Sequence, residues 1–274
     1  MESVAGKTAV ITGAASGIGA GMAQAFAEAG MSTVIADIDA DAAAQVAERL
    51  RRDGTQAVAV PTDVSSWESV QHLADVTHAT FGAAHVLCNN AGVFLAGPVA
   101  NMRVDDWRWV FSVNVFGVIH GIHAFLPRMT GLDGGAHIVN TASVAGFGSG
   151  AGFGAVYSAA KGAVVSISEA LREELAPSGI GVTALCPAAV NTRILAAQRN
   201  RPIDYGAPAA EPLGIAPITV GLEPLDVGRR VLQAVLADEP WVFTHPEVLK
   251  AGAAARFNRI LDAVDAALEG QSPG

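Results

Sequence analysis

Short apolar runs rich in β-branched residues alternate along this chain with longer stretches in which apolar residues recur at helical spacing. The short runs predict strands and the longer stretches predict helices. The predicted strands are residues 7–12, 32–37, 57–60, 86–89, 137–141, 181–186 and 241–244. The predicted helices are residues 18–29, 42–52, 67–80, 105–129, 156–175 and 226–236, the fourth of which should bend or end near Pro127.

A strand followed by a helix, repeated along the chain, is typical of parallel strands joined by crossover helices. The strands are continuously apolar rather than alternating, as a sheet covered on both faces requires. We therefore expect a single doubly wound, three-layer α/β domain of the Rossmann type over residues 1–274, with a mainly parallel sheet of seven strands. Ligands bind to such sheets at the carboxyl ends of the strands.

Residues 191–223 interrupt the alternation with several prolines and little periodicity. This stretch follows the sixth strand, at the edge of the sheet where a ligand is expected. A long loop at such a place is often an active-site lid, although a surface loop without a function is the alternative. Residues 247–274 are expected to form a C-terminal tail.

The chain has 274 residues, a hydrophobic fraction of 51% and a formal net charge of −9. An acidic surface repels nucleic-acid phosphates and anionic lipids, so we expect neither nucleic acid nor a membrane as partner. No uninterrupted apolar run approaches the roughly 20 residues of a membrane span. We also recognise no targeting segment.

The two cysteines, Cys88 and Cys186, each lie inside an apolar run. We expect small buried residues rather than a disulfide, which suits a reducing compartment and a cytoplasmic location. The seven histidines are dispersed, without accompanying carboxylates or cysteines, so we expect no metal site.

Residues 12–19 (TGAASGIG) connect the first predicted strand to the first helix. Gly13, Gly17 and Gly19 permit a tight turn and a close approach of the backbone to a ligand. The following helix presents free N–H groups and a positive dipole end to a pyrophosphate. The motif predicts a dinucleotide-binding turn, and an ordinary strand-to-helix turn is the alternative.

Asp37 ends the second predicted strand. A carboxylate at this place can accept hydrogen bonds from both ribose hydroxyls of an adenosine, and it would repel the 2′-phosphate of NADP. No basic residue compensates at Ala15, Ser16 or Ile38. The sequence therefore favours NAD over NADP, with a helix-capping or merely solvated aspartate as the alternative.

Tyr157 and Lys161 lie four residues apart on a predicted helix and hence on one face of it. A nearby ammonium group favours the phenolate and should lower the pKa of Tyr157, which makes the pair a candidate proton donor and acceptor. Ser143 follows the fifth strand, where its hydroxyl can hold a substrate oxygen. Asn114 lies in the middle of a helix, where amides are not favoured, and could hold water that passes protons to Lys161.

The chain resembles the short-chain dehydrogenase/reductase (SDR) family over residues 7–192, because these features occur in the same order as in that family. The matching segments are 12–19 (TGAASGIG), Asp63-Val64, 89–92 (NNAG), Asn114, Ser143, 157–161 (YSAAK) and 187–192 (PAAVNT). The resemblance implies a catalytic tetrad, Asn114, Ser143, Tyr157 and Lys161, in which Ser143 and Tyr157 bind substrate. It implies NAD-binding residues, namely Gly13, Ser16, Gly17, Ile18, Gly19, Asp37, Asp63, Val64, Asn90, Tyr157, Lys161, Val190 and Thr192.

The resemblance also assigns parts of the cofactor to these residues. Asp63 and Val64 would contact adenine, and Asn90 would lie near the adenosine ribose. Val190 and Thr192 would contact the nicotinamide carboxamide, while the catalytic tyrosine and lysine would touch the nicotinamide ribose. Family members are usually homotetramers or homodimers that pack through two long helices.

One position departs from the family pattern, which usually has glycine where this chain has Ala188. An alanine resists positive φ, so the backbone beside the nicotinamide is in doubt. Residues 241–247 (WVFTHPE) resemble family members that act on bulky secondary alcohols. Phe94, Phe147 and Phe153 are candidates for an apolar substrate pocket or for core packing, and Trp107 and Trp109 for packing at a helix start or a subunit contact.

The sequence thus predicts an NAD-dependent alcohol dehydrogenase or carbonyl reductase that acts on an apolar secondary alcohol or ketone, with Tyr157 as general acid/base. Two other classes share much of this pattern. A non-catalytic, NAD-binding redox sensor would not need the tetrad. An epimerase or dehydratase that retains NAD would usually have a larger C-terminal domain.

Overall fold

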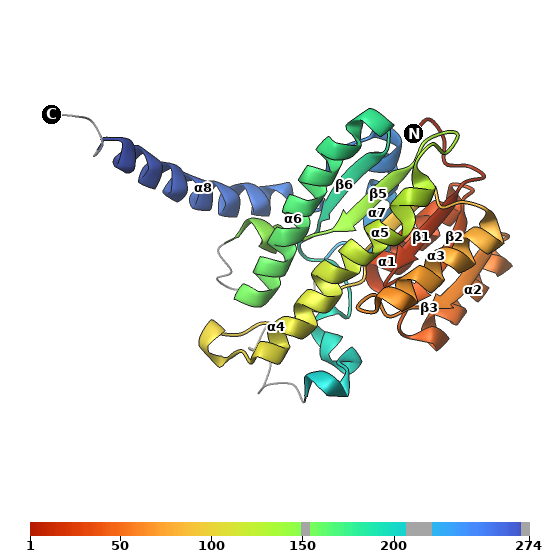
Figure 1. Ribbon diagram of the computed structural model, residues 1–274, viewed down its shortest axis with the longest axis horizontal. Helices are drawn as coiled ribbons and strands as arrows, with labels where there is room; N and C mark the ends of the chain where they lie inside the picture. The colour runs from red at the N-terminus through yellow and green to blue at the C-terminus, as the bar shows by residue number, and fades with distance from the viewer. Residues whose placement is uncertain (149–153, 207–220, 270–274) are drawn as a thin grey trace.

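Seven parallel strands form one sheet in the computed structural model, which describes residues 1–148, 154–206 and 221–269 (Figure 1). The strands are β1 (Thr8–Thr12), β2 (Ser32–Asp37), β3 (Ala57–Pro61), β4 (Val86–Asn89), β5 (His137–Thr141), β6 (Gly181–Cys186) and β7 (Trp241–Phe243). Their spatial order is β3-β2-β1-β4-β5-β6-β7, and each neighbouring pair is parallel. The predicted doubly wound sheet is confirmed, and Cys88 and Cys186 are buried free thiols within it, as expected.

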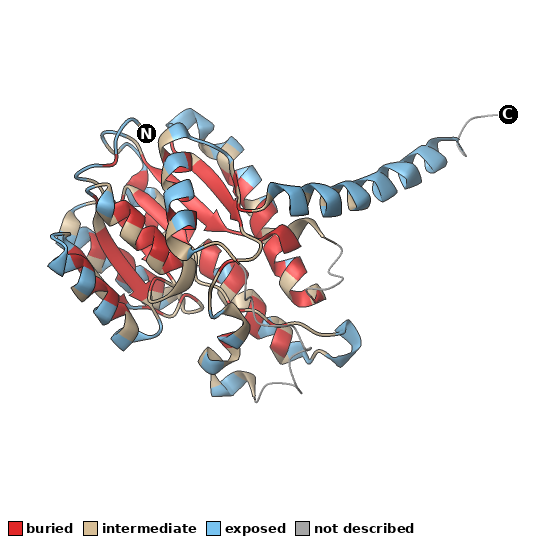
Figure 2. Ribbon diagram, turned by 180° about the vertical axis from the view of Figure 1, so that it is seen from behind, coloured by how far each residue is buried: buried red, intermediate tan, exposed pale blue. Residues whose placement is uncertain are grey.

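Helices cover both faces of this sheet (Figures 1 and 2). They are α1 (Gly17–Glu28), α2 (Ala40–Arg52), α3 (Trp67–Phe81), α4 (Val104–Phe111), α5 (Gly117–Met129), α6 (Ala155–Leu175), α7 (Pro224–Ala237) and α8 (Pro246–Glu269). An apolar cluster that includes Phe26 and Val231 joins α1, α2 and α7 to one face. A second cluster, with Leu73 and Phe125, joins α3, α5 and α6 to the other face. Burial on both sides explains why the strands are continuously apolar.

The strand order reverses between β1 and β4, which lie side by side in the middle of the sheet. From β1 the chain passes through α1 to β2 on one side, and from β4 it passes to β5 on the other side. The loops that follow β1 and β4 therefore diverge, and they leave a crevice at the carboxyl ends of the strands. Open α/β sheets bind their ligands at this switch point.

The predicted helix over residues 105–129 consists of three segments. After α4 comes a π-helix, Ser112–Phe116, and then α5, which ends at Met129 just after Pro127. The π-helix contains Asn114, and such bulges occur frequently at functional sites. Among the described helices, only the stretch Val104–Met129 is long and apolar enough to cross a membrane by length and composition; half of it is buried, and a core helix passes the same test.

Two further segments follow the last strands. The predicted lid contains 3₁₀-helices at Ile194–Asn200 and Ile203–Tyr205, while its residues 207–220 lie outside the described part of the chain. After β7 the chain forms α8, which projects away from the body and has no buried residue (Figure 2). We assigned no helix to this tail from the sequence, although its many alanines favour one.

Candidate active site

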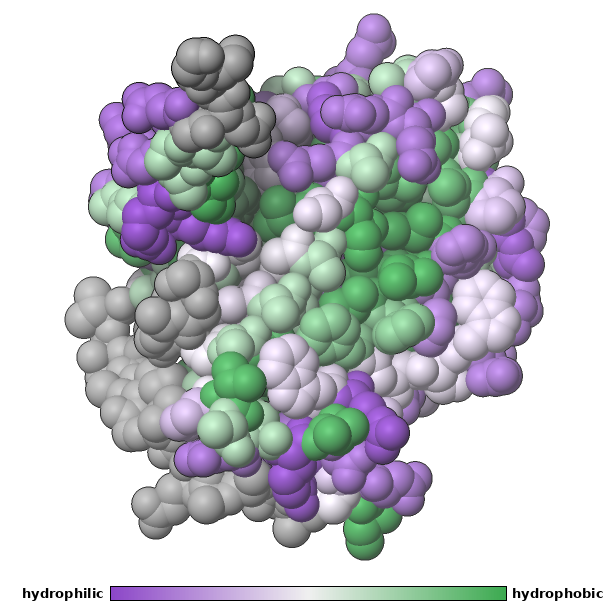
Figure 3. Space-filling model, turned by 60° about the vertical axis from the view of Figure 1, so that its left-hand side comes forward, coloured by the Kyte–Doolittle hydropathy of each residue, from purple (hydrophilic) through white to green (hydrophobic). Residues whose placement is uncertain are grey.

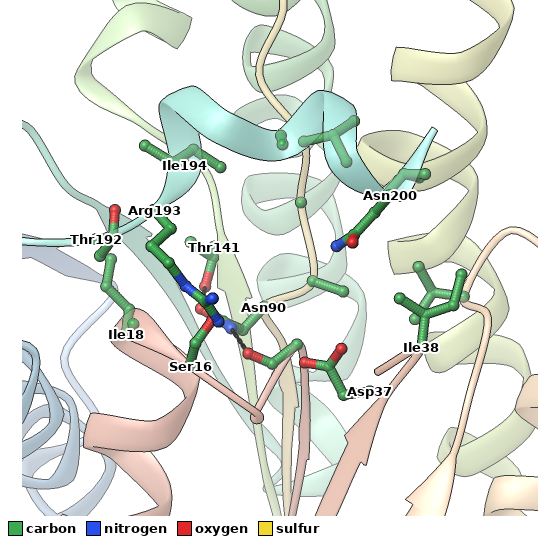
Figure 4. A pocket seen from close by; sticks show the side chains of 18 of the residues that line it. Ser16, Ile18, Asp37, Ile38, Asn90, Thr141, Thr192, Arg193, Ile194 and Asn200 are labelled. Carbon is green, nitrogen blue, oxygen red and sulfur yellow. Dashed lines mark hydrogen bonds between the residues drawn. The ribbon is translucent and has the colours of Figure 1, made fainter. Parts of the chain in front are cut away.

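A cavity lies at the carboxyl ends of the central strands and extends from β2 to β6 (Figure 4). Nearly every residue predicted to bind NAD or to act in catalysis lines it. These lining residues are Gly13, Ser16, Gly17, Ile18, Asp37, Asp63, Val64, Asn90, Ser143, Tyr157, Lys161, Val190 and Thr192. The two exceptions are Gly19 and Asn114, which support the wall from behind.

The glycine-rich turn shapes one end of this cavity because side chains would not fit in it. A Cβ atom at Gly13 would come within 2.7 Å of Ala91 Cα, and the residue has a φ of +65°. A Cβ at Gly19 would collide with the carbonyl of Gly13, so this glycine closes the turn without lining the cavity. The turn therefore forms a cradle, and the backbone at the start of α1 faces the cavity.

The N-terminus of α1 is prepared for an anion. Ser16 is the N-cap residue, and its side chain makes no capping hydrogen bond, which leaves the first N–H groups of the helix and the hydroxyl available. Thr192 lies directly beside Gly17, where a Cβ would meet its methyl group at 3.0 Å. Figure 4 shows the Arg193 side chain reaching into the cavity toward Ser16. A guanidinium, a hydroxyl and a helix N-terminus together can hold a pyrophosphate.

Arg193 is a site residue that the sequence analysis did not identify. Its only signal in the sequence was that it follows Thr192 directly. No described acidic residue forms a salt bridge with it, whereas Arg199 donates to the carbonyl oxygens of Arg193 and Ala196 at 3.2 and 2.9 Å. Arg193 is therefore the cavity-lining guanidinium that remains available for a bound anion.

Asp37 lies at the end of β2 with its carboxylate held in place by two backbone groups. Its Oδ2 accepts a hydrogen bond from Ala15 N at 2.9 Å, and its Oδ1 accepts one from Asp39 N at 3.0 Å. The N-cap of α2 is Asp39, whose side chain accepts from Ala42 N at 3.1 Å, so the helix-capping role belongs to Asp39 rather than to Asp37. Each Asp37 oxygen keeps accepting capacity for a ribose hydroxyl.

Asn90 connects the strand ends that form the floor of the cavity. Its Nδ2 donates to Thr12 O at 2.9 Å, and its Oδ1 accepts from Thr141 Oγ1 at 3.2 Å. These bonds connect the ends of β1, β4 and β5, which explains an asparagine at this place independently of any ligand. On the adenine side, Val64 is fixed by close packing against Gly117 and by a 2.9 Å hydrogen bond between its carbonyl and His120 Nδ1.

Ser143, Tyr157 and Lys161 meet at the other end of the cavity. Ser143 begins a 3₁₀-helix (Val144–Phe147) just after β5, its Oγ donates to Pro187 O at 3.3 Å, and it lies beside the Tyr157 side chain. Lys161 is buried, and its Nζ donates to Thr141 O at 2.7 Å. The Nζ atom lies 5.8 Å from the centroid of the Tyr157 ring. A hydroxyl, a phenol and an ammonium group thus share one pocket at the end of β5.

The pKa of Tyr157 is shifted in the direction opposite to our expectation. Burial removes water from the phenolate and raises the pKa to about 12, although the hydrogen bond from Ser143 opposes this. Burial also lowers the pKa of Lys161 to about 8. The neighbouring Cys186 has a smaller effect in the opposite direction. The expectation of a lowered pKa for Tyr157 was wrong, because burial disfavours the phenolate, while the Lys161 ammonium group is engaged by the Thr141 carbonyl.

Asn114 is fully buried in the π-helix and lies behind Lys161. Its Oδ1 accepts from Val93 N at 2.8 Å and its Nδ2 donates to Val93 O at 2.9 Å. A Cβ at Gly92 would lie 3.2 Å from Asn114 Oδ1 and 3.4 Å from Lys161 Nζ, so the two side chains approach each other across this glycine. The side chain of Asn114 anchors the segment after β4, in addition to the predicted water-holding role.

The region beside Tyr157 is mainly apolar. Cavity-lining residues near the loop after β6 are Val93, Trp109, Val113, Ile194, Ala197 and Pro202. Phe94 packs edge-on against the Tyr157 ring at 4.8 Å between centroids. Phe147 instead joins an aromatic cluster with Trp241 and Phe243, and Phe153 lies outside the described residues. The wall of the cavity beside Tyr157 is therefore apolar, and residues of α4 and of the segment after β6 form much of it.

A buried ion pair fixes this post-β6 segment, and the sequence analysis did not foresee it. Arg201 Nη2 lies 2.7 Å from Asp106 Oδ1, and both side chains are almost completely buried. The guanidinium also stacks over the Trp109 ring at 5.0 Å. Burial disfavours the charge on Asp106, but its hydrogen bond from Arg103 and the nearby Arg201 outweigh this and lower its pKa. The partners are far apart in sequence, so no local pattern could have revealed the pair.

Ala188 causes no backbone strain. Asp238 is the only non-glycine residue with positive φ in the described part of the chain. The nitrogen of Ala188 donates to Thr244 Oγ1 at 2.9 Å, which fixes this segment against the end of β7. The departure from the family glycine is thus accommodated in an ordinary conformation.

The geometry agrees with comparisons to known proteins. The profile of the short chain dehydrogenase family matches residues 7–202. C alpha-dehydrogenase of Sphingobium sp. (strain NBRC 103272 / SYK-6) is 34% identical over 271 residues, 96% of this chain and 88% of that protein. The 1-deoxy-11-beta-hydroxypentalenate dehydrogenase of Streptomyces exfoliatus is 38% identical over 68% of each chain.

A solved structure extends this similarity to the fold. It is a short chain dehydrogenase/reductase from Burkholderia phymatum in complex with NAD, which is 39% identical, with a TM-score of 0.90 over 96% of this chain and 97% of that chain. The family profile covers more than half of the sequence, and the sheet order and switch point are those of a Rossmann-type fold. The chain therefore belongs to the short-chain dehydrogenase/reductase family of oxidoreductases.

Proposed function

We propose that this enzyme is an NAD-dependent alcohol dehydrogenase or carbonyl reductase that uses Tyr157 as its general acid/base. The observation that carries the proposal is the meeting of Ser143, Tyr157 and Lys161 at one end of a cavity whose other end holds Asp37. The span between these ends is lined by the glycine turn and by Arg193, as a dinucleotide requires.

NAD is the cofactor that these residues fit best. Asp37 offers two carboxylate oxygens to the adenosine ribose, and a 2′-phosphate at the same place would meet a negative charge. Ile38 follows it and offers no cation. The related Burkholderia phymatum enzyme was solved with NAD, which supports this choice.

When bound in this cavity, NAD would supply the hydride acceptor or donor of the reaction. Ser143 Oγ holds the substrate oxygen by a hydrogen bond. During reduction, Tyr157 Oη gives its proton to the oxygen of the carbonyl; during oxidation, it takes the proton of the alcohol hydroxyl. After reduction, Lys161 returns a proton to Tyr157 from the buried side of the pocket, and after oxidation it accepts the proton that Tyr157 has taken up.

The raised pKa of Tyr157 sets how the rate of each direction should depend on pH. A phenol with a pKa of about 12 remains protonated and suits carbonyl reduction. Oxidation needs the phenolate, so its rate should rise with pH. The apolar wall beside Tyr157 favours an uncharged secondary alcohol or ketone, and both curated relatives described above carry dehydrogenase names.

Two other functions, a redox sensor and an epimerase or dehydratase, can be distinguished from this one by net turnover of NAD. A redox sensor would bind NAD without turnover, and an epimerase or dehydratase would reoxidise its NADH within each cycle. A panel of secondary alcohols with NAD, followed by NADH absorbance, tests the proposal against both. We expect net NADH with at least one apolar alcohol and a loss of at least about 10²-fold in kcat for Tyr157→Phe, with NAD binding retained. Wild-type turnover by Tyr157→Phe would refute the role of the tyrosine.

A further inference from the structure

The aromatic ring of Phe94 lies directly against the ring of Tyr157. The two centroids are 4.8 Å apart and the ring planes are inclined at 68°, which is an edge-to-face contact. Partial exposure alone gives a phenylalanine no role, because hydrophobic side chains gather over a broad area of the body on the side shown in Figure 3. Phe94 is distinguished by its neighbour, which is the residue proposed above as the acid/base.

The segment that carries Phe94 is fixed from the inside of the protein. Asn114 binds the backbone of Val93 through two hydrogen bonds, at 2.8 and 2.9 Å. Val93 and Leu95, on either side of Phe94, are buried in an apolar cluster that includes Val156 of α6. A fixed backbone therefore presents the ring of Phe94 to the phenol.

The start of α6 is packed closely against the same segment. A Cβ atom at Gly154, the residue before α6, would lie 2.9 Å from Ala96 Cα and 3.0 Å from Gly97 N. Tyr157 lies in the first turn of α6, three residues further on. The two rings are thus carried by backbones that touch within a few residues of the ring contact.

Phe94 reaches the phenol from outside the cavity. Val93 and Tyr157 are among the described residues that line the cavity, whereas Phe94 is not. A side chain in this place contacts Tyr157 without contacting a ligand in the cavity. The sequence left two roles open for Phe94, a substrate pocket or core packing, and its place favours packing against a reactive group.

We propose that Phe94 is a positioning residue for the reaction: its ring holds the Tyr157 phenol beside Ser143 and keeps water from that side of it. This inference rests on the proposed role of Tyr157 as acid/base. A proton donor acts only within reach of the substrate oxygen, and a misplacement of about 1 Å can cost much of the rate. Exclusion of water also disfavours the phenolate, in agreement with the raised pKa of Tyr157.

Few charged groups surround the Tyr157 ring. Lys161 lies on the same helix, with Nζ 5.8 Å from the ring centroid, and Cys186 at the end of β6 lies near Lys161. On α4, Asp106 is held in its buried ion pair, and His137 begins β5 at the opposite end of that strand. The other elements packed on α6 carry no titratable side chain; they are Ser112–Phe116, Val144–Phe147 and Ala176–Ser178. Removal of the neighbouring ring therefore changes access of water to the phenol and not a charge beside it.

Titration of the phenol tests this contact without turnover. In Tyr205→Phe, Tyr157 is the only tyrosine left of two, so the phenolate absorbance reports on it alone. Adding Phe94→Ala should lower the midpoint by at least about one pH unit, because water then reaches the phenolate. Phe111→Ala is the matched control: this half-buried ring packs against Trp107 at 6.0 Å, and its removal should not shift the midpoint.

Ketone reduction at neutral pH reports on the position of the phenol, because Tyr157 is protonated in both enzymes. With NADH and acetone, cyclohexanone or acetophenone, Phe94→Ala should lower kcat about tenfold while each KM stays within about twofold, as expected for an interaction used in the reaction step. Phe94→Tyr keeps the ring and should restore kcat. In alcohol oxidation, the rise of the rate with pH should move to lower pH by the same amount as the midpoint.

Three results would overturn the inference. Either an unchanged midpoint or an unchanged kcat in Phe94→Ala, with an active unmutated enzyme, would mean that the ring only fills space. A loss that lies in KM and grows with the size of the ketone would make Phe94 part of the substrate wall. No turnover by the unmutated enzyme, despite a shifted midpoint, would refute the proposed function itself and leave Phe94 as a packing neighbour. Far-UV circular dichroism and NAD binding identify a variant that fails to fold; Phe94→Leu, which keeps most of the apolar volume, then takes the place of Phe94→Ala.

Discussion

Replacement of Asp37 tests the cofactor preference of the site. The carboxylate is held by Ala15 N and Asp39 N, so it is already oriented toward the cavity before a ribose arrives. Each hydrogen bond to a charged group contributes roughly 1.5–3 kcal/mol, so two of them contribute at least about 3 kcal/mol. At about 1.4 kcal/mol for each factor of ten, this corresponds to a preference for NAD on the order of 10²-fold or more in kcat/KM.

Asp37→Ala should lower kcat/KM for NAD and narrow its preference over NADP. An added Ile38→Arg should narrow it further, since Ile38 is 48% exposed and lines the cavity, where a guanidinium can reach a 2′-phosphate. Asp41→Ala is the matched control: it removes a carboxylate from the first turn of α2 that does not line the cavity, so the ratio of the two kcat/KM values should not change. Initial rates with both cofactors measure this. Equal use of NAD and NADP by the unmutated enzyme would refute the reasoning.

Three further predictions follow from the contacts of the site. In Tyr205→Phe, Tyr157 is the only tyrosine left of two, and ultraviolet titration should show no phenolate below the free-tyrosine pKa of about 10; ionisation at or below that value would contradict the burial argument. Arg193→Ala should weaken NAD and ADP-ribose about tenfold but leave adenosine unchanged in calorimetric titrations, as expected for one lost phosphate contact; an equal loss for adenosine would mean a structural defect. Arg201→Met should lower the free energy of unfolding in urea by about 3 kcal/mol, because it leaves the buried Asp106 with only the more distant guanidinium of Arg103, at 3.5 Å, as a charged partner. Asp106→Asn/Arg201→Met should recover part of this loss, and an unchanged free energy of unfolding would show that the pair is not stabilising.

The sequence predicted those features that depend on local pattern. Continuous apolar runs located all seven strands, and the strand–turn–helix context of residues 12–19 located the cradle. The parallel order of the sheet brings four of the predicted site residues to one cavity: Asp37 ends β2, Ser143 follows β5, and Tyr157 and Lys161 lie on α6.

Features that arise only from tertiary packing could not be predicted in this way. The Asp106–Arg201 pair joins α4 to a distant segment, and the apolar pattern around Asn114 reads the same for an α-helix as for a π-helix. The direction of the Tyr157 pKa was mistaken because the pairing with Lys161 is visible in the sequence, whereas the burial of both groups is not. The tail was not predicted to be a helix, although its alanines and the spacing of Phe257, Ile260, Leu261 and Val264 favour one.

Transfer of a labelled hydride tests the central claim most directly. A secondary alcohol that carries deuterium on its carbinol carbon is mixed with the enzyme and NAD, and the reduced cofactor is analysed by mass spectrometry and proton NMR. The account predicts net NADH with one deuterium at C4 of the nicotinamide, formed far more slowly by Tyr157→Phe. Binding of NAD with no labelled NADH from any alcohol that the enzyme converts would contradict it.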